Sequence, residues 1–218
     1  MRRLLVHVEG QTEESFVNDV LRPHLTSFQY ESVSARLLGR RRERSHRGGV
    51  RPWPGVKDEI ERHLKQDSGL KVGLVVDFYG MPNDWPGRAS ASALAVPDRS
   101  AAIGAAMGLT VDASLRPRFF PCVLMHEFEA FVFADPVGAS EAWGRSDLEG
   151  PLSSIRKAFL TAEHINDSPE TAPSKRLQAI VPGYEKPLMG SLAVFTIGLA
   201  TLRQACPSFG SWLSALEQ

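Results

Sequence analysis

Four short runs rich in apolar residues, separated by longer helical patterns, are the feature that most limits how this chain can fold. Runs of this kind are typical of strands in a parallel sheet that is covered on both faces. The runs are Leu4–Val8, Ser32–Leu38, Val72–Val76 and Phe119–Met125. Their alternation with helices predicts an α/β fold with a mostly parallel sheet of about four strands, flanked by helices.

The last third of the chain has a different pattern, because helical segments follow one another with no further strand signal. We therefore expect residues 1–150 to form an α/β core and residues 151–218 to form a helical extension packed on that core. Residues 81–93 are rich in Pro, Gly and Ser, which predicts a loop. Helices are expected after Thr12 (with a kink or end at Pro23), at 56–66, from Pro97, at 126–133, near 151–163, from Ser174, at 190–204 and at 209–216.

The net charge of the 218-residue chain is zero, but the charge is unevenly distributed. Residues 36–51 contain seven arginines and one glutamate, so this stretch carries a net charge of +6. Clustered arginines bind phosphates and stack on bases, which predicts a nucleic-acid partner. A disordered basic loop and a docking surface for an acidic partner are the alternatives. The arginines concerned are Arg40, Arg41, Arg42, Arg44, Arg47 and Arg51.

Two tryptophans, Trp53 and Trp85, lie in Pro- and Gly-rich stretches, where they either stack on a base or cover the edge of the core. The two cysteines form no paired motif, which suits a reducing cytoplasm. The absence of 18 consecutive apolar residues predicts no membrane span, and the N-terminus does not have the pattern of a signal peptide. The helical apolar stripe Leu192, Phe195, Leu199 and Leu202 predicts a core or a homo-oligomer interface.

Acidic residues follow three of the four predicted strands. Glu9 follows the first, Asp77 the third, and Glu127 and Glu129 the fourth. The carboxyl ends of parallel strands lie at one edge of a sheet, so these side chains are expected to converge there and to bind Mg²⁺ or Mn²⁺. The alternative is that each acid caps a helix or lies in a solvated loop.

Glu127 and Glu129 are two residues apart, so on a helix they would point about 200° apart. We therefore expect only one of them to face the site, and Glu127 is favoured because it is closer to the strand. The adjacent His126 is either a packed residue or a group that orients or transfers a proton. Further along, Lys175 and Arg176 follow Ser174 at a predicted helix start, where they either bind a phosphate or are simply solvated.

Five strings resemble, in order and nearly end to end, the bacterial family named domain of unknown function 4276. They are VEGQTEESFV, VVDFYG, HEFEAFVFAD, INDSPETAPSKRL and IGLATLRQACPSFGSWLSAL. The first string also looks like the opening motif of Toprim domains, which occur in topoisomerases, primases and the overcoming-lysogenization-defect nucleases. The resemblance implies a Toprim/Rossmann-like fold with Glu9, Glu13 and Asp77 as metal-site acids.

The family resemblance also implies a role for Lys175 near the scissile phosphate, and an ATPase partner in antiphage defence. The Asp-x-Asp pair of Toprim domains reads Asp77-Phe78-Tyr79 here, so the second acid is missing unless Glu127 or Glu129 replaces it. We therefore expect a Mg²⁺- or Mn²⁺-dependent phosphodiesterase, a nuclease acting on DNA or tRNA, with Glu9, Asp77 and Lys175 as catalytic residues. The alternatives are a non-catalytic effector or sensor subunit that docks on an ATPase, and a primase-like activity.

Overall fold

The computed structural model describes residues 2–38, 51–166 and 168–218, and it contains one four-stranded parallel sheet. The strands are β1 (Arg2–Val8), β2 (Tyr30–Leu37), β3 (Leu70–Asp77) and β4 (Phe119–Leu124). All of the residues from Val72 to Val76 in β3 are buried, as expected for a strand covered on both faces. The predicted α/β fold with a parallel sheet of four strands is therefore confirmed.

The strand order β2-β1-β3-β4 gives the sheet a switch point, at which the order in which successive strands are added reverses. From β1 the chain goes to β2 on one side, and then crosses to β3 on the other side of β1. Ligands of open parallel sheets bind outside the carboxyl ends of the strands at such a switch point. Here that point lies between the ends of β1 and β3.

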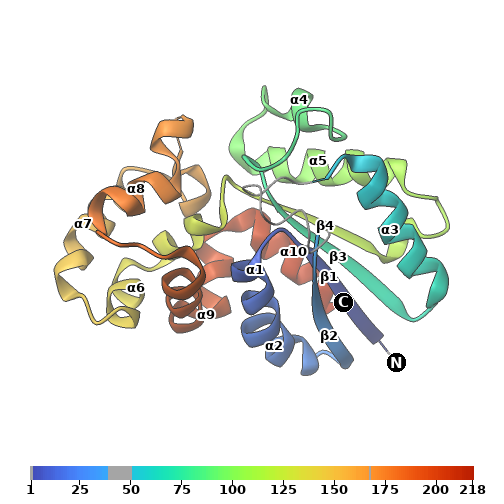
Figure 1. Ribbon diagram of the computed structural model, residues 1–218, viewed down its shortest axis with the longest axis horizontal. Helices are drawn as coiled ribbons and strands as arrows, with labels where there is room; N and C mark the ends of the chain where they lie inside the picture. The colour runs from blue at the N-terminus through green and yellow to red at the C-terminus, as the bar shows by residue number, and fades with distance from the viewer. Residues whose placement is uncertain (1, 39–50, 167) are drawn as a thin grey trace.

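Helices cover both faces of the sheet (Figure 1). On one face, α3 (Trp53–Gln66) and α5 (Val96–Thr110) pack with Val72, Leu74 and Val76 in one hydrophobic core. On the other face, residues of the N-terminal helices and of α10 (Pro207–Glu217) pack with Leu4 and Val6 in a second core. The sheet is therefore the middle of three layers.

The segment after β1 is one helical stretch with a π-turn in its middle. It comprises α1 (Gln11–Phe16), η1 (Val17–Leu21) and α2 (Arg22–Thr26). The N–H of Arg22 donates to the carbonyl of Val17, five residues earlier, immediately before Pro23. Because Pro23 has no N–H to continue the regular α-helical ladder, the predicted kink takes the form of this wider turn.

The C-terminal helices share the core with the sheet. Trp212 of α10 donates from Nε1 to the carbonyl of Phe120 in β4 at 3.0 Å, and the Tyr30 hydroxyl of β2 donates to the carbonyl of Leu216 at 2.7 Å.

A lobe of short helices lies beyond the sheet edge (Figure 1). The remaining elements are α4 (Arg88–Ala91), η3 (Arg116–Arg118), η4 (Phe128–Ala134), α6 (Pro136–Ala142), η5 (Ser146–Leu148), α7 (Glu149–Lys157), η6 (Ala162–His164), η7 (Pro169–Thr171), α8 (Pro173–Ile180), η8 (Lys186–Gly190) and α9 (Ser191–Ala205).

Three details differ from the sequence-based expectations. The helix expected near 151–163 ends at Lys157, and the helix expected from 126 is a 3₁₀ helix that begins at Phe128. The loop at 81–93 contains the short helix α4.

The two tryptophans are buried against each other rather than available to a base. Their ring centroids are 5.1 Å apart, and only 6% of Trp53 and 2% of Trp85 is exposed. Their indole N–H groups donate to Thr110 Oγ1 and to the carbonyl of Arg51. They therefore join α3, α5 and the loop after β3, and cover the edge of the core.

Helix α9 is less regular than its sequence suggests. Gly198 has φ 76° and ψ 159°, which breaks the helical backbone in its second half. Among the described residues, one helical stretch, Lys186–Ala205, has the length and composition needed to cross a membrane, and about a third of its most apolar part is buried within the fold. Core helices of soluble proteins meet the same criterion, so the absence of a membrane span stays a prediction.

Leu213→Ala tests whether α10 belongs to the same cooperative core as the sheet. Leu213 is fully buried, so the substitution should lower the free energy of unfolding by about 2–5 kcal/mol in urea denaturation. Leu160→Ala is the matched control, because Leu160 is 81% exposed and should change stability by no more than about 0.5 kcal/mol. Equal stability of the two variants would contradict this packing.

Candidate functional site

The ends of β1 and β3 bring two of the predicted acids into direct contact. Glu9 immediately follows β1, and its Oε1 accepts a hydrogen bond of 2.7 Å from the backbone N–H of Asp77, the last residue of β3. This contact lies at the switch point of the sheet. The structure thus brings Glu9 and Asp77 together, as their places after two parallel strands predict.

A lysine that the sequence analysis did not identify lies at the centre of the site. Lys186 begins η8, and its ammonium contacts three carboxylates. The distances from Nζ are 3.1 Å to Glu129 Oε2, 3.4 Å to Glu13 Oε1 and 3.6 Å to Asp77 Oδ2. We call Glu9, Glu13, Asp77 and Glu129 the carboxylate cluster, with Lys186 as its central cation.

Burial dominates the electrostatics of the carboxylate cluster. It raises the pKa of Glu9 to about 7, although the hydrogen bond from Asp77 opposes the shift, and Glu13 adds repulsion. Burial also raises the pKa of Asp77, against the attraction of Lys186 and with repulsion from the other three acids, and it raises the pKa of Glu129. Burial alone would lower the pKa of Lys186, but Asp77, Glu13 and Glu129 outweigh it and raise the pKa.

Two glycines allow the backbone to approach the carboxylates closely. A Cβ atom at Gly80 would lie 2.7 Å from Glu9 Oε2, and one at Gly10 would lie 3.0 Å from Glu13 Oε2. Gly80 belongs to the turn that follows β3, so this turn closes over Glu9. A side chain at position 80 would push the Glu9 carboxylate from its place.

The structure reverses the expected roles of Glu127 and Glu129. The chain stays extended through Glu127, whose Oε2 accepts a hydrogen bond of 3.0 Å from the N–H of Ser174 in the first turn of α8. Glu129 lies in the first turn of η4 and contacts Lys186. The sequence favours Glu127 because it is closer to the strand, but its backbone is still extended and the later helix start turns Glu129 to the cluster instead.

His126 does not contact the cluster. Its side chain is buried, Nε2 lies 3.2 Å from Arg99 Nη1, and the ring packs against Phe78 and Tyr79. Burial and the charge of Arg99 lower the pKa of His126 to about 4, so the imidazole is neutral at pH 7. It therefore acts as a neutral packing and hydrogen-bonding group in this fold.

The predicted phosphate-binding pair also lies away from the cluster contacts. Lys175 is exposed, and its Nζ lies 3.5 Å from Gln178 Oε1. Arg176 donates from Nε to the carbonyl of Thr171 at 2.8 Å and lies over the Phe159 ring. The lysine that meets the carboxylates is therefore Lys186, for which the sequence offers no signal beyond a lysine that precedes Pro187 at a helix start.

Most of the arginine-rich stretch lies outside the described residues: Arg40, Arg41, Arg42, Arg44 and Arg47. Its two ends are described and lie close to the same sheet edge. The N–H of Leu38 donates to the carbonyl of Val8 at 2.8 Å, and the carbonyl of Arg51 accepts from Trp85 Nε1 at 3.1 Å. The described residues on either side, Leu38 and Arg51, are thus held near the carboxyl edge.

Both flanks of this stretch are also held by one carboxylate. Glu59 of α3 pairs with Arg36 at 2.5 Å and with Arg51. Burial by itself would raise the pKa of Glu59, but the hydrogen bonds from Arg51 and Arg36 outweigh it and lower the pKa to about 2. Glu59 is therefore ionised at neutral pH and fixes the two arginines that border the basic stretch.

The carboxylate cluster has the ligand chemistry of a Mg²⁺ or Mn²⁺ site, since all of its acceptors are hard oxygens. Asp77 Oδ1 is buried and has no hydrogen-bond partner, so one oxygen is available to a cation. Among the residues that the structure describes, no three His, Cys, Asp or Glu side chains are already grouped as a metal site. Binding of an ion therefore requires the Lys186 ammonium to move from the oxygens that it now contacts.

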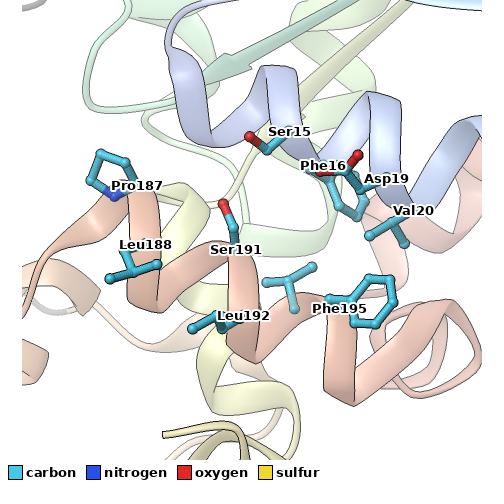
Figure 2. A pocket seen from close by; sticks show the side chains of 10 residues that line it. Ser15, Phe16, Asp19, Val20, Pro187, Leu188, Ser191, Leu192 and Phe195 are labelled. Atoms are coloured by element: carbon cyan, nitrogen blue, oxygen red, sulfur yellow. The ribbon is translucent and has the colours of Figure 1, made fainter.

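A shallow apolar groove lies beside the cluster rather than over it. It has a volume of about 380 Å³ and runs between the α1–η1 stretch and the η8–α9 stretch (Figure 2). Phe16 and Val20 line one side, and Leu188, Leu192 and Phe195 line the other. Because Leu192 is 45% and Phe195 is 65% exposed while Leu202 is buried, the predicted apolar stripe of α9 is only partly core.

Comparison with known proteins identifies a family but no characterised relative. The family described as Domain of unknown function (DUF4276) matches residues 8–217. No curated protein matches the chain, and no solved structure matches it. What the site does must therefore be argued from its geometry.

Glu9→Gln tests the electrostatics of the cluster in metal-free buffer. Folded Glu9 binds a proton more tightly than the unfolded chain, so its contribution to stability falls as the pH rises from 4.5 to about 7 and stays low above that. The glutamine side chain of the variant stays neutral and keeps an oxygen for the Asp77 N–H. The variant should therefore gain on the order of 1 kcal/mol or more over the wild type between about pH 5 and about pH 8.

The measurement is urea unfolding of both proteins across that pH range. Glu141→Gln, at an exposed position, serves as the control and should stay within about 0.5 kcal/mol of the wild type. A Glu9→Gln difference that does not change with pH would show that Glu9 is not held in a proton-binding environment.

Proposed function

This chain belongs to the DUF4276 family, and we propose that it is a Mg²⁺- or Mn²⁺-dependent phosphodiesterase, a nuclease that cleaves DNA or tRNA. One observation carries the proposal. Acids that follow β1 and that lie in α1, β3 and η4 converge at the carboxyl edge of a parallel sheet, and three of them already share one cation, the ammonium of Lys186. Such a site suits a hard divalent ion and a phosphate ester.

Asp77 and Glu129 are the residues that would hold the ion, with Glu9 and Glu13 in support. When bound, a divalent ion supplies charge stabilisation at the phosphate and lowers the pKa of a water molecule. The Glu9 carboxylate lies beside Asp77 at the same sheet edge, so in this proposal it takes the proton from the attacking water. The hydrogen bond from the Asp77 N–H and the turn at Gly80 keep its carboxylate in place.

Lys186 has a role in this proposal that the sequence analysis gave to Lys175. About a third of its side chain is exposed, so the ammonium can leave the carboxylates without opening the core. Its long side chain then brings a positive charge to the phosphate that is being cleaved, where such charge stabilises the transition state. The same ammonium balances the acids when no ion is bound.

The resemblance to Toprim domains supports the same chemistry. Glu9, Glu13 and Asp77 stand where that motif has acids, and Tyr79 stands where the second acid of the Asp-x-Asp pair is expected. Glu129 supplies a carboxylate at the site from another segment. We therefore propose that Glu129 replaces the missing acid, and that the family resemblance extends to antiphage defence with an ATPase partner.

A second candidate is a non-catalytic subunit that docks on an ATPase. It is favoured by the exposed apolar residues Leu188, Leu192 and Phe195 on η8 and α9, and by Lys186, which already compensates part of the cluster charge. In that case the cluster would act as a structural ion-pair network. Metal binding separates the two candidates, since only the first needs an ion in place of Lys186.

Calorimetric titration with Mn²⁺ tests the metal site. The wild type should bind the ion, and Asp77→Asn and Glu129→Gln should each weaken binding at least roughly 100-fold because a charged ligand is lost. Glu127→Gln is the matched control, because Glu127 caps α8 and should leave Mn²⁺ affinity nearly unchanged. The proposed site would be contradicted if the wild type binds no Mn²⁺, or if all three variants lose Mn²⁺ affinity to the same extent.

Incubation with DNA and with tRNA in Mg²⁺ or Mn²⁺ tests the reaction. We expect cleavage of one substrate class, abolished by EDTA and reduced roughly 100-fold or more in Asp77→Asn. Equal cleavage by the wild type and Asp77→Asn would remove Asp77 from the mechanism. Mn²⁺ binding without cleavage of either substrate, alone or with the ATPase partner, would favour the docking subunit.

A further inference from the structure

Two arginines lie beside the ring of Phe78, the residue that follows Asp77. The guanidinium of Arg88, at the start of α4, lies 3.7 Å from the centre of the Phe78 ring. The guanidinium of Arg99, in the first turn of α5, lies 5.6 Å from the same ring. Two side chains from different helices thus place positive charge beside one aromatic ring at the carboxyl end of β3.

Neither arginine forms an ion pair within the described part of the chain; the polar contacts of both are with neutral groups. Arg88 donates to the carbonyl of Phe78 and to Ser92 Oγ. Arg99 donates to the carbonyls of Leu94 and Ser92 and lies beside Nε2 of the neutral His126. Burial and the charge of Arg99 lower the pKa of Arg88, as expected for like charges held together.

These contacts leave donors unused on both side chains. A guanidinium has five N–H groups. The hydrogen bonds above use two of them on Arg88 and three on Arg99. Both side chains are half-buried rather than enclosed, so the unused N–H groups are available to a ligand.

The arginine pair and the carboxylate cluster lie on opposite sides of the same strand end. Successive side chains of a strand point to opposite faces, so Asp77 and Phe78 diverge. Asp77 meets Lys186, whereas Phe78 packs in the core beneath α3 and α5. The N–H of Tyr79 donates to the carbonyl of His126 at 3.2 Å, which joins the ends of β3 and β4 between the two groups.

The two groups have complementary charge imbalances. The carboxylate cluster has four acids and one lysine, so it lacks positive charge. Among the residues that the structure describes, the arginine pair has two cations and no acidic partner, so it lacks negative charge there. A phosphate group beside the pair would supply that charge, and guanidinium groups bind phosphate oxygens through paired N–H donors.

We propose that Arg88 and Arg99 form a phosphate-binding subsite that holds a backbone phosphate of the nucleic acid next to the one at the carboxylate cluster. This inference rests on the proposed function for the identity of the ligand as a phosphodiester chain. Contacts of this kind fix the register of a nucleic-acid strand without reading its bases. The subsite would therefore position the scissile bond at the cluster.

The test is the binding of a short fluorescein-labelled single-stranded DNA, and in parallel of tRNA, followed by anisotropy in EDTA over a series of salt concentrations. Arg88→Gln and Arg99→Gln should each weaken binding about tenfold. Each should also lower the slope of log affinity against log salt by about 0.7, because one phosphate contact is lost. Arg88→Lys and Arg99→Lys keep the charge and should retain most of that slope.

Arg116→Gln is the matched control, because Arg116 is also half-buried and donates to backbone carbonyls, but it lies in η3, beside the C-terminal end of α5. It should bind with the affinity and salt slope of the wild type. Wild-type affinity and slope in folded Arg88→Gln and Arg99→Gln proteins would overturn the subsite, as would the absence of any binding by the wild type. If the Gln variants do not fold, weaker binding by the Lys variants than by Arg116→Gln, at a nearly unchanged salt slope, supports the subsite, because lysine keeps the charge but loses the paired N–H donors. Unchanged affinity of the Lys variants then overturns it.

The experiment separates this inference from the proposed function. Mn²⁺ titration of the same variants should give wild-type affinity, since neither arginine contacts the carboxylates. If the Arg88→Gln and Arg99→Gln variants bind both Mn²⁺ and DNA like the wild type, the proposed phosphate subsite is disproved and the proposed metal site is not affected. If DNA binding depends on the two arginines but no protein binds Mn²⁺, the phosphate subsite is supported and the proposed metal-dependent phosphodiesterase activity is contradicted.

Discussion

The ammonium of Lys186 among buried carboxylates is the interaction on which the geometry of this site depends. It links α1, β3 and η4 through Glu13, Asp77 and Glu129, segments that are far apart in the sequence. Four buried acids would repel one another at this edge without a cation. One lysine cannot balance them all, so the remaining charge is met by bound protons or by a further cation. Burial is the main cause of the raised pKa of Glu9, to about 7, and repulsion from Glu13 adds to it.

The strand order places these acids where parallel sheets bind their ligands. Glu9 and Asp77 lie at the ends of the two central strands, at the switch point of the sheet, where a ligand can reach both. On the other side of the end of β3, Arg88 and Arg99 carry positive charge over Phe78. A divalent ion and a phosphodiester chain together would satisfy both groups. This complementarity links the proposed chemistry to the proposed mode of substrate binding.

The sequence predicts the sheet well, because its strands are local apolar runs that differ clearly from the helical patterns between them. It also indicates Glu9 and Asp77, since residues at the ends of parallel strands share one edge. It could not choose between Glu127 and Glu129, because that choice depends on where η4 begins. Lys186 and the pair Arg88 and Arg99 carry no local pattern. Only the packing of η8, α4 and α5 against the sheet brings these cations to the site.

The central claim is that one divalent ion takes the place that Lys186 now occupies among the carboxylates. Anomalous diffraction from crystals soaked in Mn²⁺ tests it most directly, because the signal locates the ion itself. The account predicts a single strong peak bonded to oxygens of Asp77 and Glu129, with the Lys186 ammonium displaced from both. Lys186 still seated between those carboxylates, with no manganese peak beside them, would contradict it.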